Sequence, residues 1–313
     1  MIYIGIDLGG TNIAVGAVDE EGKILAEQSV KTLAQRPFEE IVKDMAGCVS
    51  RVMEKLKITQ KDVKSIGIGI PGVADDQGMV LNCTNLGWIN MPLAAEMGKY
   101  FDLPVFIGND ANVAALAESY AGVSKGCRSS VMITLGTGVG GGIVIDGKPW
   151  AGAHGRGGEI GHMTLIPDGV PCTCGNNGCV ERYCSATALI RMARQECYAY
   201  PDSLILKKTG GDLDKINAKL VIDAAKEGDA CALRVYNDFV RFLALSINNI
   251  TAFFDPEIIV LGGGVSHAGD YLLNAVRALV PRFQMFKALP IPRLELARLG
   301  NEAGIIGAAM LGK

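Results

Sequence analysis

The sequence predicts an α/β fold made of two related halves. Residues 2–18 and residues 131–145 share one design, in which an apolar strand enters a Gly/Thr turn and a second apolar strand leaves it. This is the pattern of a β-hairpin. Elsewhere in the chain, strand-like and helix-like segments alternate, which is typical of α/β proteins. The repeat therefore predicts two α/β halves that face a shared cleft, each with a Gly/Thr-lined turn.

The segments between the two hairpins support this fold class. Apolar residues at helical spacing predict an amphipathic helix over residues 38–56. Short apolar runs predict buried strands at 65–70 and 104–108. A helix over 111–120 follows the second of these strands, so this half also alternates between strand and helix.

The region after the second hairpin is richer in predicted helix. A strand at 258–260 leads into the glycine cluster Gly262–Gly264. We expect a helix from near Ala268 to Leu279, ending before Pro281, because proline disfavours a helix interior. The other helices expected in this region are 218–226, 230–250 and 301–311.

The composition indicates a globular protein and argues against two classes of partner, nucleic acid and membrane. A chain of 313 residues is long enough for two domains, and 49% hydrophobic residues predict a sizeable core. The net charge of −3, with no basic block, argues against a nucleic-acid partner. Apolar runs stop well short of ~20 residues, so we expect no membrane span.

The first residues and the cysteines bear on the cellular compartment. The opening Met-Ile-Tyr-Ile-Gly-Ile-Asp has no basic segment and no cleavage site, so it predicts a strand rather than a signal peptide. We therefore expect a cytoplasmic protein. The nine cysteines are then interpreted as metal ligands and core thiols, not as a disulfide framework.

A cluster of cysteines predicts a metal site. Cys172, Cys174 and Cys179 follow His162 in the order His-x9-Cys-x-Cys-x4-Cys. Three thiolates and one imidazole are the ligands of a closed tetrahedral zinc site. The alternative is that His162 is a core histidine with no metal.

Two carboxylates flank these ligands. Glu159 precedes the histidine by three residues, and Glu181 follows the last cysteine by two. A metal that fixes this loop also fixes both side chains, so we expect them to line a pocket for a polar substrate. The alternative is that both are solvated surface charges.

The glycine-rich turns suit phosphate. At Gly9–Thr11 and Gly136–Gly138 the backbone can approach closely, and amides and threonine hydroxyls can donate to oxyanions. Neither turn is a Walker loop. The alternative is a tight hairpin without a ligand. Gly262–Gly264, between a strand and a helix, also suits a nucleotide, although this signal is weak alone.

Three polar residues near predicted strand ends are candidates for chemistry. Asp110 can accept the proton of an attacking hydroxyl, as kinases require, or it can simply cap the following helix. Asp7 can orient a phosphate-bound Mg²⁺ or bond turn amides. Asn85 can bind sugar hydroxyls or be a turn residue.

Four blocks of sequence carry a resemblance to a known family. On these blocks the chain resembles the ROK family (repressors, open reading frames and sugar kinases), within the superfamily of actin-like ATPases. The cysteine block is highly specific, and the resemblance spans nearly the whole chain. The blocks are Asp7-Leu-Gly-Gly-Thr11, Gly108-Asn-Asp-Ala111, Gly158-Glu-Ile-Gly-His162 and Cys172-Thr-Cys-Gly-Asn-Asn-Gly-Cys-Val-Glu181.

The resemblance implies the architecture of the chain. It implies two actin-like (ribonuclease H-like) ATPase domains with a cleft between them. The small N-terminal domain would comprise residues 1–120 plus about 298–313, because the last helix of this family usually returns to the first domain. The large domain would comprise residues 121–297 and carry the zinc loop. The family also implies a homodimer.

The same resemblance implies a kinase that uses ATP and Mg²⁺ to phosphorylate the 6-hydroxyl of a hexose, with glucose the first choice. Asp110 would be the general base. The sugar ligands would be Asn85, Asn109, Asp110, Glu159, His162 and Glu181. The ligands of a structural zinc would be His162, Cys172, Cys174 and Cys179. The ATP site would comprise Asp7, Gly9, Gly10, Thr11, Asn12, Gly136, Thr137, Gly138, Gly262, Gly263 and Gly264.

Three other functions compete with this interpretation. The family includes sugar-responsive repressors with an N-terminal helix-turn-helix domain, for which the hairpin starting at residue 2 leaves no room. A second alternative is a kinase for N-acetylmannosamine or N-acetylglucosamine, which needs a small apolar pocket beside the sugar 2-position. The third is an inactive sugar-binding module, which the joint presence of Asp7, Thr11 and Asp110 disfavours.

Overall fold

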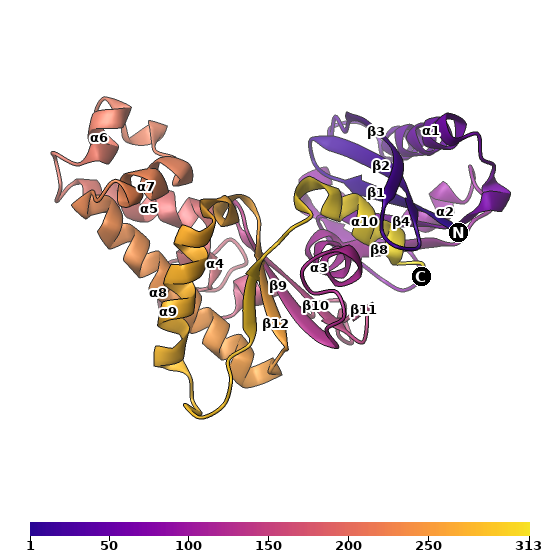
Figure 1. The fold of residues 1–313 in the computed structure, drawn as a ribbon. Helices are drawn as coiled ribbons and strands as arrows, with labels where there is room; N and C mark the ends of the chain where they lie inside the picture. Colours follow the sequence, from indigo (N-terminus) through magenta and orange to yellow (C-terminus); the bar gives the residue numbers. More distant parts are fainter. The chain divides into compact units, whose positions relative to one another are not determined.

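A computed structural model describes residues 1–313 and confirms the α/β fold class (Figure 1). The chain divides into two compact units. Unit 1 comprises residues 1–132, 142–158 and 298–313, and unit 2 comprises residues 133–141 and 159–297. None of the helices has the length and apolar composition that crossing a membrane requires.

The strands form two five-stranded sheets and one three-stranded sheet. The strands are β1 Ile2–Leu8, β2 Asn12–Asp19, β3 Ile24–Lys31, β4 Val63–Ile70, β5 Val73–Ala74, β6 Val80–Cys83, β7 Trp88–Met91, β8 Val105–Asn109, β9 Ser129–Leu135, β10 Val139–Ile145, β11 Lys148–Pro149, β12 Ile258–Gly262 and β13 Arg293–Leu296. The helices are α1 Phe38–Leu56, α2 Leu93–Met97, α3 Asp110–Ala121, α4 Glu181–Cys184, α5 Ala186–Cys197, α6 Leu204–Thr209, α7 Ala218–Lys226, α8 Ala230–Phe254, α9 Asp270–Phe283 and α10 Ala303–Met310.

The two large sheets have the same strand order. The first is β3-β2-β1-β4-β8 and the second is β11-β10-β9-β12-β13. In the first sheet, β1 pairs antiparallel with β2 and parallel with β4, and β4 pairs parallel with β8. In the second sheet, β10 pairs antiparallel with β11, and β12 pairs parallel with β13. The internal repeat seen in the hairpins therefore extends to whole sheets.

Helix α1 covers one face of the first sheet and has the predicted bounds (Figure 1). It packs against β2 and β3. Ile41, Met45, Val49 and Val52, which recur at helical spacing, are all fully buried. The amphipathic pattern predicted this helix correctly because its apolar stripe is the face that joins the core.

Helix α10 packs against β1, β4 and α3 (Figure 1). It approaches the strands so closely that a Cβ on Gly5 would overlap the carbonyl oxygen of Ile305, and one on Gly67 would overlap that of Ala308. Glycine is required at both strand positions because no larger side chain fits beneath the helix. The last helix of the chain thus completes the core of unit 1.

Two helices of unit 2 run further than the sequence predicts. Helix α9 continues past Pro281 to Phe283, whereas we predicted an end before the proline. The fixed φ of proline is compatible with a helix, and a proline so near the end removes one backbone hydrogen bond only. Helix α8 extends to Phe254, four residues beyond the predicted end at Ile250.

The limits of the two units differ from the predicted domains mainly at residues 142–158. These residues include the end of β10 and all of β11, and they lie in unit 1, whereas β10 begins in unit 2. The physical reason is close packing on α3, because a Cβ on Gly142 would overlap the carbonyl oxygen of Ala111. The division into functional domains stays a prediction.

Candidate functional site

The predicted site residues form two groups, one in each unit. In unit 1, the fully buried Thr32 fixes the turn between β1 and β2 through two hydrogen bonds. The Thr32 hydroxyl donates to the carbonyl oxygen of Gly9 at 2.6 Å, and its amide donates to that of Thr11 at 2.9 Å. Gly10 and Thr11 themselves are exposed. The turn is therefore rigid at its base and open to a ligand at its tip.

Asp7 lies at the end of β1, directly before this turn. It is half-buried against the start of α10, where a Cβ on Gly304 would overlap its Oδ2. Burial and, to a lesser extent, the charge of Asp110 raise the pKa of Asp7 to about 6. A carboxylate whose pKa is raised partly by a second carboxylate nearby marks a suitable place for a divalent cation.

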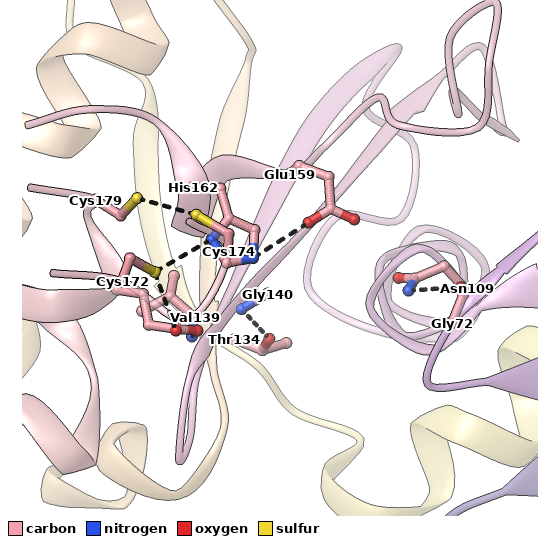
Figure 2. A network of polar contacts seen from close by, with 11 residues as sticks. Gly72, Asn109, Thr134, Val139, Gly140, Glu159, His162, Cys172, Cys174 and Cys179 are labelled. Atoms are coloured by element: carbon pink, nitrogen blue, oxygen red, sulfur yellow. Dashed lines mark hydrogen bonds and ion pairs between the residues drawn. The ribbon is translucent and has the colours of Figure 1, made fainter. Parts of the chain in front are cut away.

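Asp110 is the first residue of α3 and is exposed. The cap of this helix is Asn109, whose side-chain oxygen accepts from the amides of Ala111 at 2.9 Å and Asn112 at 3.4 Å. The Asn109 side-chain nitrogen donates to the carbonyl oxygen of Gly72 at 3.2 Å (Figure 2). Sequence left open which of the two residues caps the helix, and the structure assigns the cap to Asn109.

Asn85 lies in the short 3-10 turn Thr84–Leu86 and is exposed. A Cβ built on Gly10 would lie 3.8 Å from the Cβ of Asn85. Asn85 therefore lies next to the first Gly/Thr turn, within the same unit.

In unit 2, the turn between β9 and β10 is held by the start of α5. The amide of Ala186 donates to the carbonyl oxygen of Gly136 at 2.8 Å, and the Thr187 hydroxyl donates to that of Thr137 at 2.7 Å. Thr137 is exposed. This turn, like the first, is fixed by a threonine hydroxyl and presents its own threonine at the surface.

Glu181 connects this turn to the cysteine cluster. Its Oε2 accepts from the amide of Val139 at 3.0 Å, and its Oε1 lies 4.0 Å from the Sγ of Cys172. A Cβ on Gly138 would overlap Oε2, so a larger residue there would displace the Glu181 carboxylate. The carboxylate is thus held between the glycine turn and the cysteine loop.

The predicted zinc ligands come together (Figure 2). The ligand atoms of His162, Cys172, Cys174 and Cys179 all lie within 4.8 Å of one another. The Cys174 and Cys179 sulfurs are 3.6 Å apart, and the Cys172 sulfur is 3.8 Å from Nδ1 of His162. Tetrahedral zinc with bonds of ~2.3 Å to sulfur and ~2.0 Å to nitrogen holds ligand atoms about 3.5–3.8 Å apart. The cluster therefore fits zinc.

The environments of two of these thiols differ. Burial raises the pKa of the Cys179 thiol to about 12. The backbone amide of Asn176 holds the pKa of the exposed Cys174 thiol below its usual range. One ligand thus lies inside the loop and one at its surface.

The second ring nitrogen of His162 points away from the cysteines. Its Nε2 lies 4.0 Å from Oε2 of Glu159 (Figure 2). Both side chains keep a substantial exposed fraction, 36% for His162 and 50% for Glu159. With Nδ1 toward the cluster, Nε2 and the Glu159 carboxylate remain available to a polar ligand.

The third glycine cluster follows β12. Gly263 has a φ of 80°, and a Cβ there would lie 2.7 Å from the backbone of Leu135. Gly264 is exposed and begins a 3-10 turn, Gly264–Ala268, and α9 starts only at Asp270. Glycine is needed for both conformation and space at Gly263, whatever its ligand.

Sequence reasoning missed the side chains that hold the two turns. Thr32 contacts a turn 23 residues before it, and Thr187 contacts one 50 residues before it. The only local signal at Thr32 is a polar residue directly after a strand, which is common in loops. Contacts over such separations depend on the fold and not on a motif.

Comparison with known proteins identifies the family. The sequence model of the ROK family matches residues 3–313. The glucokinase of Halalkalibacterium halodurans is 38% identical, over 99% of this chain and 94% of its own. The N-acetyl-D-glucosamine kinase of Haemophilus influenzae is 32% identical, over 99% of both chains. A ROK family glucokinase from Streptomyces griseus, solved in complex with glucose and AMPPNP, is 37% identical, covers 99% of both chains and superposes with a TM-score of 0.81. The predicted resemblance is confirmed, and the chain belongs to the ROK family.

Proposed function

We propose that this protein is an ATP-dependent hexose kinase that phosphorylates the 6-hydroxyl of glucose. The observation that carries the proposal is the pair Asp7 and Asp110 beside the Gly9–Thr11 turn, whose tip is exposed. Asp110 is exposed at the start of α3, where Asn109 is the cap and Oδ1 of Asp110 accepts from the amide of Ala111 at 2.8 Å. The glucokinase relatives, which match nearly the whole chain, support the same reaction.

In this proposal Asp110 is the general base. Its carboxylate accepts the proton of the sugar 6-hydroxyl as that oxygen attacks the terminal phosphoryl group. Phosphoryl transfer needs positioning and charge neutralisation more than covalent chemistry. The amides and hydroxyls of Gly9–Thr11 and Gly136–Gly138 bind phosphate oxygens, and Gly262–Gly264 lies near the nucleoside.

Asp7 would hold Mg²⁺, together with ATP phosphate oxygens. The ion, when bound, neutralises charge that develops on the phosphates. Its fit rests on the position of the Asp7 carboxylate, which lies directly before the Gly9–Thr11 turn and close enough to Asp110 for that charge to raise its pKa.

The four clustered side chains would hold a structural zinc. With no open position, the ion acts as a crosslink and takes no part in the chemistry. It fixes the loop that carries Glu159, Nε2 of His162 and Glu181, and these side chains would bind sugar hydroxyls with Asn85 and Asn109. His162 would thus serve both metal and sugar. The homodimer stays a prediction.

A second candidate is a kinase for an N-acetylated hexose, which the Haemophilus influenzae relative supports. A glucose site requires hydroxyl partners at the 2-position, whereas an acetamido group requires a small apolar pocket. A coupled assay with ATP across glucose, mannose, N-acetylmannosamine and N-acetylglucosamine tests the choice. We expect kcat/KM to be highest for glucose. A higher value for an N-acetylated sugar would establish the second candidate, and no turnover of any hexose would remove both.

Replacing Asp7 with Asn is expected to raise stability while it lowers activity. The ordinary pKa of the group is 3.8 and the folded value is about 6, so the native state binds more protons than the unfolded chain between these limits. The stability that protonated Asp7 contributes is present below pH ~4 and is lost as pH rises through ~6. At pH 8 the ionised group costs up to about 3 kcal/mol, which Asn removes.

Thermal melts at pH 5 and pH 8 measure this effect in the metal-free protein. We expect the Tm of Asp7→Asn to exceed that of the wild type at pH 8 and the gap to narrow at pH 5. Asp76→Asn, an exposed aspartate of the same unit, is the control and should show neither change. An equal gap at both pH values would contradict the raised pKa of Asp7.

A further inference from the structure

Glu118 is a fully buried carboxylate to which the proposed chemistry assigns no role. Buried acids are rare unless they are paired. No lysine, arginine or histidine lies within ion-pair distance of Glu118, and its partners are backbone amides. Its Oε2 accepts from Val123 at 2.9 Å, and its Oε1 accepts from Arg298 at 2.7 Å and from Leu299 at 2.9 Å.

These amides belong to two segments that are far apart in the sequence. Val123 lies directly beyond the end of α3, whereas Arg298 and Leu299 lead into α10, 180 residues after Glu118. One side chain therefore ties the exit of α3 to the entry of α10. A Cβ on Gly122 would overlap Oε2 of Glu118, so the neighbouring glycine leaves room for this arrangement.

The two helices joined in this way both lie against the acids of the site. Helix α3 begins with Asp110, and the start of α10 packs against Asp7 at Gly304. The helices lie side by side (Figure 1). Ala117 and Ala303 form a small buried cluster between them with Ile306. Pairing of β1 and β8 through β4 fixes the backbone at both acids, and the start of α10 then limits where the Asp7 side chain can lie relative to Asp110.

We propose that Glu118 is a positioning residue for phosphoryl transfer: its carboxylate holds the entry of α10 against α3 and so sets the spacing of Asp7 and Asp110. The inference rests on the proposed kinase function. An ionised carboxylate only accepts hydrogen bonds, so it can serve all three amides. Glutamine of the same shape has one accepting oxygen, and its NH₂ group would face an amide donor.

Glu118→Gln tests the proposal. We expect kcat to fall by about tenfold or more, because small displacements of reacting groups are costly, while the dissociation constants of glucose and AMPPNP from calorimetry stay nearly unchanged. The acid limb of the pH–rate profile should also move, since the spacing of two carboxylates changes. Hydrogen exchange at the Arg298 and Leu299 amides should accelerate.

Val52→Ala is the control for general destabilisation, because Val52 is fully buried on α1, which packs mainly against β2 and β3. It should lower Tm and leave kcat and the pH profile of the folded protein unchanged. If Glu118→Gln behaves in the same way, Glu118 is only structural and the proposal is overturned.

Gly122→Ala keeps the test decisive if the glutamine variant does not fold. The added methyl group displaces the Glu118 carboxylate and retains its charge, so we expect the same loss of kcat. Wild-type kcat in this variant, or unchanged exchange at Arg298 and Leu299, would overturn the role of Glu118. Absence of hexose phosphorylation by the wild type would instead overturn the proposed function. The exchange data would still decide whether the Glu118 carboxylate holds the entry of α10 against α3.

Discussion

Replacing Asp110 with Asn is expected to lower kcat by about 10² or more while leaving glucose affinity nearly unchanged. The substitution preserves the shape of the side chain but removes its negative charge and its ability to take a proton. Helix α3 should stay intact, because its cap is Asn109. The loss should therefore appear in the chemical step, since binding of the sugar does not need the proton to move.

The measurement combines steady-state kinetics with calorimetric titration of glucose. Asp102→Asn is a matched control, because Asp102 is also exposed and lies eight residues earlier in the same unit. It should behave as the wild type in both assays. Near-normal turnover in Asp110→Asn would remove Asp110 as the base, and a large loss of glucose affinity would make it a binding residue instead.

Replacing Cys174 with Ala is expected to release the metal and to weaken sugar binding by at least about tenfold. Purified wild-type protein should contain one zinc per chain. Cys174 is the exposed member of the cluster, so its truncation removes little packing. The effect should thus come from the lost ligand, which frees the loop that carries Glu159 and Glu181. Nucleotide affinity should change less than sugar affinity.

Elemental analysis and titration of both ligands check this result. Cys197→Ala is the control, since Cys197 is a buried thiol of unit 2 outside the cluster. It should retain zinc and sugar affinity, although it removes more packing. Metal-free wild type that is folded and active would contradict the zinc assignment. A greater loss of nucleotide affinity than of sugar affinity would mean that the loop serves the other ligand.

The sequence predicted the elements whose pattern is local. Helix α1 and helix α7 have the expected bounds because their apolar residues keep one face over several turns. The two hairpins were predicted because a Gly/Thr turn between apolar strands is a short-range signal. The clustering of the four candidate metal ligands was predicted for the same reason, since they lie within 18 residues, from His162 to Cys179.

The sequence could not predict the contacts that depend on the fold. Asn109 and Asp110 are both good capping residues, so their order alone did not reveal which one caps α3. The hydrogen bond from the Val139 amide to Glu181 spans 42 residues, and the hydrogen bond from the Arg298 amide to Glu118 spans 180. Neither has a motif. The extension of α9 through Pro281 was missed because proline disfavours a helix interior in general, whereas Pro281 lies only two residues before the helix ends, where its cost is small.

The discontinuous path of unit 1 has a consequence for biosynthesis. The strands of its first sheet, β3-β2-β1-β4-β8, all lie before residue 110, but α10, which covers β1 and β4 at Gly5 and Gly67, is made from residues 303–310. During translation, the face of the N-terminal sheet that α10 covers therefore stays exposed until almost the entire polypeptide has been synthesised. A ribosome that stalls in the last dozen codons would leave an intermediate that lacks α10 and exposes apolar surface, and chaperones bind such surfaces.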